Sequence, residues 1–286
     1  MTMMRWRDNA TPPTGSDDDN ILNPGQHVYP FWFSLPLHLP SAFEGTHGYI
    51  RYTVKGTIGR PGKFDYHTVR SFTVLEIMDL NKEALALNAG EIQDSKYLCC
   101  LCCKSGPIAG TMKLNRMGYV PGESIYFEAS AQNSTTRVCS MYAELEMVIS
   151  YHARKDKSRE ERKSIKRIQH DDIPPGHSDV WSGEKFVIPP LAPSYLKTCN
   201  LIDVKYFAKL VISPSGPALE LNLPVEIIIG TIPLQSAVEP STPSVIPTST
   251  FSESVWGPTN IESEEDGEHT EGERNFTPKY SYYTWQ

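Results

Sequence analysis

The chain has 286 residues, a formal net charge of −7 and 39% hydrophobic residues. The negative charge argues against a nucleic-acid binder, because phosphate contacts require a basic surface. Six cysteines in a chain of this length do not make a disulfide scaffold. The sequence shows neither an apolar signal-peptide core nor an apolar run of the roughly 18 residues that a membrane span needs. We therefore expect a cytoplasmic protein that binds no nucleic acid.

A first β-rich block is expected over residues 23–98, after a polar, disordered leader at 1–22. In YIRYTVKGTI, the residues Ile50, Tyr52 and Val54 share one face and alternate with polar residues, which is typical of a half-buried strand. The turn GRPGKFD follows, and HTVRSFTVLEI then supplies a partner strand. The pattern predicts a β-hairpin.

A second β-rich block is expected over residues 107–235, joined to the first by a Cys-rich linker at 99–106. The segments SIYFEASAQN, SMYAELEMVIS and DVKYFAKLVIS alternate apolar and polar residues, and LELNLPVEIIIGTIPL closes the block. Helical spacing persists nowhere along the chain. Short strands with regular turn signals are typical of an all-β sandwich, so the predicted fold class is all-β with two such blocks.

The amino-acid composition changes again in the last segment, residues 236–286. It is rich in Ser, Thr and Pro, then acidic in ESEEDGEHTEGE, and it ends in the aromatic NFTPKYSYYTWQ. Because such a composition buries too little apolar surface to offset chain entropy, we expect a disordered tail.

No motif with catalytic spacing is found. The sequence lacks GxSxG, HExxH, a P-loop and GxGxxG, and its eight histidines are scattered. We therefore expect a protein that is not an enzyme, with no cofactor and no bound metal.

Two clusters carry candidate chemistry outside catalysis. The stretch KYLCCLCCKSG contains Cys99, Cys100, Cys102 and Cys103, for which a zinc knuckle, a redox dithiol, acylated thiols and simply packed thiols are the alternatives. A zinc site usually needs a second ligand pair, and the next cysteine, Cys139, stands alone.

The second cluster is the basic run HARKDKSREERKSIKRIQHDD. It is interpreted either as a solvated hairpin loop or as a basic patch for anionic lipid, a phosphorylated tail or the chain's own acidic tail. Its basic residues are Arg154, Lys155, Lys157, Arg159, Arg162, Lys163, Lys166 and Arg167.

Four segments resemble the arrestin-domain-containing proteins, or α-arrestins. They are LPSAFEGTHGYIRYTVKGTIGRPGKFD, SGPIAGTMKLNRMGYVPGESI, FVIPPLAPSYLKTCNLIDVKYFAKLVI and LNLPVEIIIGTIPL, in the family's order. The turn G-Y-x-P-G-E-S and the ending G-T-I-P-L are the most specific of these features. The resemblance implies two tandem arrestin-type β-sandwiches, the first of them incomplete because its initial strands are missing.

The resemblance also implies a function. Members of the family are adaptors without enzymatic activity that bind membrane receptors or transporters as cargo and recruit WW-domain ubiquitin ligases for endocytosis and sorting. Peripheral contact with the plasma membrane or endosomes would follow. The chain departs from the family in lacking PPxY; the tail has only TPKY, with Pro278 and Tyr280. Gly62 stands where the family has an aromatic residue.

Two alternatives remain beside the adaptor. Cys199 in YLKTCNLI falls where one family member has a cysteine that pairs with thioredoxin, which would make the chain a thiol-based redox regulator with thioredoxin-like partners. The third interpretation is a shortened product that is non-functional or dominant-negative.

Overall fold

The computed structural model describes part of the chain in two compact units, residues 1–39 and 40–286. The described residues are 25–59, 62–100, 103–153, 157–235, 247–261 and 270–285, without the side chains of 99, 100, 103–105, 270 and 271. In the first unit, residues 25–39 carry exposed aromatic side chains, among them Trp32, and form no strand. The expected leader at 1–22 lies outside the described residues.

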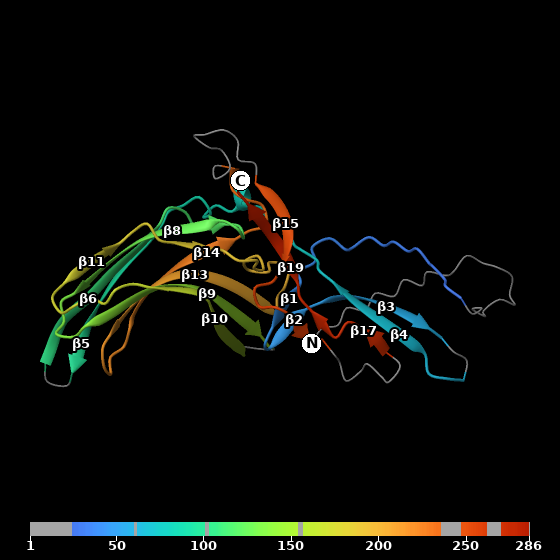
Figure 1. The fold of residues 1–286 in the computed structure, drawn as a ribbon, viewed down its shortest axis with the longest axis horizontal. Coiled ribbons are helices and arrows are strands. Elements are labelled where there is room, and N and C mark those ends of the chain that lie inside the picture. Colours follow the sequence, from blue (N-terminus) through green and yellow to red (C-terminus); the bar gives the residue numbers. More distant parts are fainter. Residues whose placement is uncertain are drawn as a thin grey trace. The chain divides into compact units, whose positions relative to one another are not determined.

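The second unit contains a two-sheet sandwich (Figure 1). The first sheet has the spatial order β10 (Ser158–Gln169), β9 (Cys139–His152), β13 (Ile202–Pro214), β14 (Leu221–Ile229) and β7 (Gly118–Tyr119). The second sheet has the order β11 (Ser178–Trp181), β8 (Ser124–Asn133), β6 (Cys103–Leu114) and β5 (Gly90–Cys100), with β12 (Lys185–Val187) also paired to β8.

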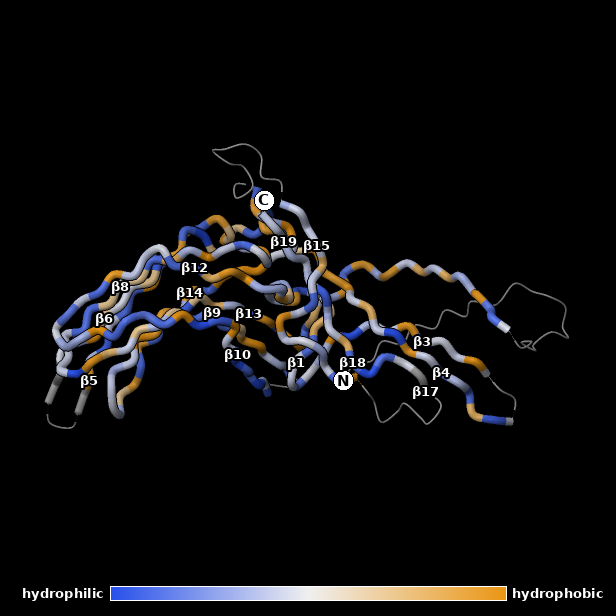
Figure 2. The backbone as a smooth tube through the Cα atoms, viewed as in Figure 1, coloured by the Kyte–Doolittle hydropathy of each residue, from blue (hydrophilic) through white to orange (hydrophobic). Residues whose placement is uncertain are grey.

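Alternation along the strands builds this sandwich. Met141, Leu145 and Ile149 of β9 are fully buried and face the other sheet, as do Tyr206 and Leu210 of β13. Hydrophilic and hydrophobic residues alternate along the sandwich strands in Figure 2. The strand phases predicted from the sequence are confirmed here, because a period of two puts every second side chain on the same face.

Smaller elements precede the sandwich. They are β1 (Phe43–Gly45), β2 (Gly48–Ile50), β3 (Tyr52–Ile58), β4 (Tyr66–Phe72) and the 3-10 helix η1 (Leu80–Lys82). The antiparallel pairing of β3 with β4 confirms the predicted hairpin. The Asp79 side chain caps η1 by accepting from the Asn81 backbone nitrogen.

The predicted Cys-rich linker is wrong in position. β5 and β6 pair antiparallel from Gly90↔Leu114 to Cys100↔Cys103, so this stretch is the end of a hairpin inside one sheet. The sequence suggested a linker because the cysteine stretch falls between two β-rich blocks. β5, which the prediction placed in the first block, therefore pairs within a sheet of the sandwich.

The C-terminal segment also differs from its prediction. Where the structure describes it, the segment forms β15 (Thr248–Glu253), β16 (Thr259–Asn260), β17 (Thr270–Gly272), β18 (Asn275–Phe276) and β19 (Lys279–Thr284). A disordered tail is thus wrong for these residues, because a few aromatic side chains find partners far away in the chain. The rest of the predicted tail lies outside the described residues.

Within the described residues, no helix is long and apolar enough to cross a membrane.

Candidate partner-binding site

Strand β19 anchors the C-terminal segment in the core of the second unit. The side chain of Tyr280 is 3% exposed and belongs to the main hydrophobic cluster. Its hydroxyl donates to the Ala42 carbonyl at 3.0 Å, across 238 positions of sequence. Burial, with the nearby Glu44 carboxylate adding, raises the pKa of Tyr280 far above its usual range. Tyr280 is therefore a buried, neutral anchor.

A turn after β7 receives the other end of β19. The Tyr283 backbone nitrogen donates to the Pro121 carbonyl at 2.9 Å, and the Tyr283 hydroxyl donates to the Thr231 carbonyl at 2.7 Å. Gly122 has a φ of +97°, and a Cβ at this position would overlap the carbonyl oxygen of Tyr283. Only glycine satisfies both conditions, so the turn is shaped for the strand that lies on it.

An internal ion pair holds this turn. Arg116 contacts the Glu123 carboxylate at 3.0 Å, with side chains that are 16% and 5% exposed. The same carboxylate accepts a hydrogen bond from the Val120 backbone nitrogen at 2.9 Å. These contacts lie in the G-Y-x-P-G-E-S turn, which the sequence marked only through its resemblance to a family.

The sequence-predicted partner residues lie inside this arrangement. Pro278 is buried, and its carbonyl accepts from the Ser254 backbone nitrogen at 2.9 Å. Lys279 donates its backbone nitrogen to the Thr73 hydroxyl at 3.0 Å. With Tyr280 buried as well, TPKY is part of the folded body rather than an exposed peptide.

The predicted basic patch forms most of edge strand β10. Arg162 contacts Glu146 at 3.1 Å, and Arg167 contacts Glu144 at 3.1 Å, so two of its charges are balanced by β9. Lys163 contacts Glu161 on its own strand. Lys157, Arg159 and Lys166 are exposed, while Arg154 and Lys155 lie outside the described residues. The run is thus a strand with mixed charge rather than the solvated loop that was one of its two interpretations.

A cation from β13 completes the charge network. The Lys209 ammonium lies 2.8 Å from Glu144 and 2.9 Å from Glu146, and the side chains of both acids are nearly buried. Burial alone would raise the pKa of Glu144, but hydrogen bonds from Lys209, Ser164 and Arg167 outweigh it and lower the pKa. This face of the sheet is a satisfied polar surface.

The cysteines fall into separate places. The side chains of Cys99, Cys100, Cys102 and Cys103 lie outside the described residues, and the backbone puts three of these residues at the end of the β5–β6 hairpin. Cys199 is free and half-buried in a turn, with its backbone nitrogen donating to the Leu196 carbonyl at 2.7 Å.

Cys139 is free and fully buried, and burial raises the pKa of its thiol. Burial, with the charges of Cys199 and Glu76 adding, raises the pKa of Tyr52 to about 12. Among the described residues, no group of three or more His, Cys, Asp or Glu side chains could hold a metal ion.

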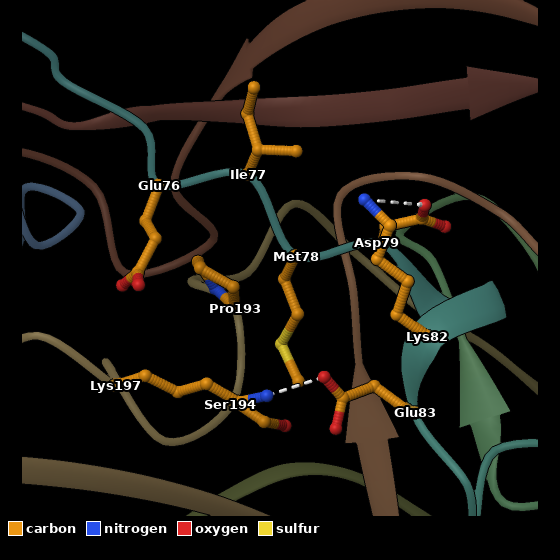
Figure 3. A pocket seen from close by; sticks show the side chains of 9 residues that line it. All are labelled: Glu76, Ile77, Met78, Asp79, Lys82, Glu83, Pro193, Ser194 and Lys197. Atoms are coloured by element: carbon orange, nitrogen blue, oxygen red, sulfur yellow. Dashed lines mark hydrogen bonds and ion pairs between the residues drawn. The ribbon is translucent and has the colours of Figure 1, made fainter. Parts of the chain in front are cut away.

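A small hollow of about 120 Å³ lies beside η1 (Figure 3). An ion pair between Lys197 and Glu83 crosses it, and Lys82 pairs with Asp79 at 3.7 Å. This volume holds a few water molecules and is below the several hundred Å³ of ordinary ligand pockets.

Comparisons with known proteins match this chain to two arrestin domains. The domain described as Arrestin (or S-antigen), C-terminal domain, matches residues 104–234, and the corresponding N-terminal domain matches residues 6–81. The match to the N-terminal domain begins inside residues 1–22, which were expected to be a disordered leader.

Several curated proteins are similar. Arrestin domain-containing protein 17 of Caenorhabditis elegans is 31% identical over 77% of this chain and 51% of its own length. Arrestin domain-containing protein 4 of Homo sapiens is 33% identical over 78% of this chain and 52% of its own. Thioredoxin-interacting protein of Sus scrofa is 27% identical over 87% of this chain and 62% of its own length. The chain spans about half the length of the first two relatives.

Proposed function

Because the chain belongs to the arrestin-domain-containing, or α-arrestin, family, we propose that it is a non-enzymatic adaptor that links membrane cargo to ubiquitin-dependent endocytosis and sorting. The single observation that carries this proposal is the ordered pair of arrestin domains, the second of which covers the sandwich strands from β6 to β14. A protein of this kind acts by presenting surfaces, and the described part of the second unit consists mainly of strands and the loops between them.

The partners in this proposal are a membrane receptor or transporter and a WW-domain ubiquitin ligase. The adaptor works in the cytoplasm and is recruited to the plasma membrane or endosomes when cargo is present. The exposed cations Arg159 and Lys166 of β10, with Lys157 directly before the strand, support peripheral contact with anionic lipid headgroups. Their number is small, so cargo binding supplies most of the affinity.

Proximity labelling in cells tests the adaptor. The whole chain is fused to a labelling enzyme and compared with a Tyr206→Asp variant, in which a charge in the core is expected to unfold the sandwich. We expect membrane transporters or receptors and ubiquitin-pathway proteins to be enriched with the wild type and lost with the variant. A labelled set without membrane proteins contradicts the proposal.

A thiol-based role is the second candidate, favoured by the free and half-buried state of Cys199. In this proposal, peroxide oxidises the Cys199 thiol to a sulfenic acid, and the thiolate of a thioredoxin-like partner displaces hydroxide from it to form a mixed disulfide. The hairpin cysteines at 99–103 are oxidised by peroxide or acylated. Capture by a thioredoxin variant that traps mixed disulfides tests it. A Cys199→Ser chain that is captured as well as the wild type rules out the Cys199 version.

A further inference from the structure

Strand β5 is the longer free edge of the second sheet (Figure 1). The order β11, β8, β6, β5 leaves one side of β5 without a neighbouring strand among the described residues. At the opposite edge, β11 has four residues, whereas β5 has eleven. A long edge strand presents a row of unpaired N–H and C=O groups, which can pair with another chain unless the sequence guards the edge. β5 is therefore a candidate interaction surface.

Two charges of opposite sign lie on this strand. Asp94 and Lys96 are two positions apart, so their side chains are on the same face. Within the described residues, neither forms an ion pair, whereas Glu91 of the same strand pairs with Lys113 at 2.9 Å. The Lys96 ammonium donates a long hydrogen bond, 3.4 Å, to the Glu220 carbonyl. Asp94 and Lys96 therefore carry charges that a partner can balance.

Between these two charges, a side chain meets the backbone of the strand. The Ser95 backbone nitrogen donates to the Asp94 Oδ1 atom at 2.7 Å. A backbone N–H needs an acceptor, and a neighbouring carboxylate supplies one where no carbonyl of another strand is present. A strand that arrives at this edge can supply the carbonyl instead, and the Asp94 carboxylate is then released to meet a cation.

We propose that β5 pairs antiparallel with β5 of a second copy of this chain, about a two-fold axis at Ser95, so that the second sheets of the two copies join into one. Such an axis places Asp94 opposite the partner's Lys96, and Lys96 opposite the partner's Asp94. Ser95 meets the partner's Ser95, and Gln93 meets the partner's Tyr97. The surface is therefore complementary to itself. This inference does not depend on the proposed function, because the dimer needs neither cargo nor ligase.

Other two-fold registers of this strand are less favourable. An axis at Asp94 brings two carboxylates face to face, and an axis at Lys96 brings two ammonium groups face to face. Like charges directly opposite each other destabilise a pair of strands, and opposite charges stabilise it. With the axis at Ser95, the two serines exchange both backbone hydrogen bonds. The flanking charged pairs are then of the non-hydrogen-bonded kind, in which side chains lie closer together.

The other long edges of the described sheets do not offer this match. In β10, Arg162 and Arg167 are already paired with acids of β9, and Lys163 is paired with Glu161 of its own strand. In β3, which is the edge of the sheet β17, β4, β3, Lys55 is the one charged residue. Pairing of either strand with its own copy would therefore gain little from new ion pairs. The balance of charge favours β5.

Sedimentation velocity of the whole purified chain over a wide range of concentrations tests the proposal. Asp94→Lys and Lys96→Asp each convert both symmetric pairs into like-charge pairs. The matched control is Arg159→Asp, which makes the same change of charge as Lys96→Asp at an exposed position of the other edge strand, β10. We expect the wild type and Arg159→Asp to dimerise equally. Each of the other two variants should raise the dissociation constant at least about tenfold, equivalent to about 1.4 kcal/mol.

Mixing the two variants tests the register itself. An equal mixture of Asp94→Lys and Lys96→Asp chains should dimerise like the wild type, because the two positive positions of one chain then face the two negative positions of the other. The double variant Asp94→Lys/Lys96→Asp should also dimerise alone. Added salt should weaken the wild-type dimer and strengthen that of each single variant, since it screens attraction in the first case and repulsion in the second.

The fold of each variant is checked by its midpoint in urea. Asp94 is exposed, so its replacement should leave the midpoint unchanged. If Lys96→Asp alone is unfolded, because Lys96 is half-buried, Asp94→Lys and the double variant still decide between the outcomes.

Three results would overturn the proposal. A wild-type chain that stays monomeric at every concentration would show that the edge has no partner in a second copy. A dimer that Asp94→Lys leaves intact would use another surface. A mixture of the two single variants that stays monomeric would contradict the axis at Ser95. None of these results bears on the membrane proteins found by proximity labelling, so this proposal and the adaptor role fail separately.

Discussion

Replacing Lys209 by Met should destabilise the sandwich by leaving two nearly buried carboxylates with weaker partners. The Lys209 ammonium lies 2.8 Å from Glu144 and 2.9 Å from Glu146, and the three side chains are 14%, 5% and 9% exposed. Methionine keeps most of the apolar length of the lysine side chain and removes only the charge. The substitution therefore isolates the ion pairs from the packing of the stem.

The expected cost lies between two limits. Removing one partner of a fully buried ion pair costs about 3–5 kcal/mol, and removing one from an exposed pair costs about 0–1 kcal/mol. Arg162 and Arg167 stay beside the two carboxylates, but their side chains are 58% and 51% exposed and their charges are partly screened. We expect a loss of about 2 kcal/mol.

Urea denaturation followed by tryptophan fluorescence measures this loss. With a slope of about 3 kcal/mol/M, the midpoint should fall by about 0.7 M. The control is Lys205→Met on the same strand, because Lys205 and Glu226 are 3.5 Å apart with side chains 42% and 37% exposed. That pair should contribute less than about 0.5 kcal/mol.

One result would refute the reasoning. If the free energy of unfolding of Lys209→Met lies within about 0.5 kcal/mol of the wild-type value, the arginines and water already satisfy both carboxylates. A second check uses the Glu144→Gln/Glu146→Gln background, in which the substitution of Lys209 should cost less than it does alone.

The contribution of this charge network to the stability of the fold also depends on pH. The pKa of Glu144 in the folded protein is lowered from 4.5. The stabilisation that ionised Glu144 gives the fold is therefore complete above pH 4.5, and it is lost as the pH falls through the pKa of the folded state. Burial lowers the pKa of Lys209, but bonds to Glu144 and Glu146 outweigh it and raise the pKa above 10.5. The contribution of Lys209 is complete below pH 10.5 and is lost as the pH rises through the folded-state value. The difference between wild type and Lys209→Met should therefore be constant from about pH 5 to 10 and shrink outside that range.

Three further predictions concern single buried groups. Asn133→Ala should cost about 2–4 kcal/mol in urea denaturation, since its buried amide donates to the carbonyls of residues 137, 173 and 174; a cost below about 1 kcal/mol would contradict this. Tyr280→Phe should cost about 1 kcal/mol, because only the hydrogen bond to Ala42 is lost, and a neutral result would mean that water replaces it. Iodoacetamide should label Cys199 before the fully buried Cys139, as mass spectrometry of the folded chain can show; the reverse order would place Cys139 at the surface.

The sandwich could be predicted from the sequence because its information is local. In β8, the residues Ile125, Phe127, Ala129 and Ala131 alternate with polar neighbours, and all four are buried. The face of each side chain follows from the extended backbone alone. The same argument gave the β3–β4 hairpin, whose turn contains Gly and Pro.

The C-terminal segment could not be predicted because its burial is non-local. Phe276 and Tyr280 lie at the end of a segment whose earlier part is rich in Ser, Thr, Pro and acidic residues, and this composition favours disorder. Their partners are far away in sequence, for example Ala42 for Tyr280. A local pattern shows how much apolar surface a segment has but not which distant surface will cover it.

The charge partners of β10 were hidden for a related reason. The sequence showed that Arg162 and Arg167 are in a basic run, and their acids, Glu146 and Glu144, were visible as the polar face of a separate strand. Their pairing depends on the register between β9 and β10, which shifts between Ser164 and Lys166. The bulge moves the partly buried positions from Lys163 and Ile165 to Ile168, but which acids these positions meet is set by tertiary packing.

The turn G-Y-V-P-G-E-S, one of the most specific features of the family resemblance, has a physical role in the structure. In G-Y-V-P-G-E-S, Pro121 supplies the carbonyl that binds Tyr283, Gly122 permits the close approach, and Glu123 fixes the turn through Arg116. Each of these roles concerns the C-terminal strand or the shape of its seat. Since the seat lies in the second arrestin domain and β19 lies in the C-terminal segment, a change in this turn can loosen the strand without changing the strand's own residues.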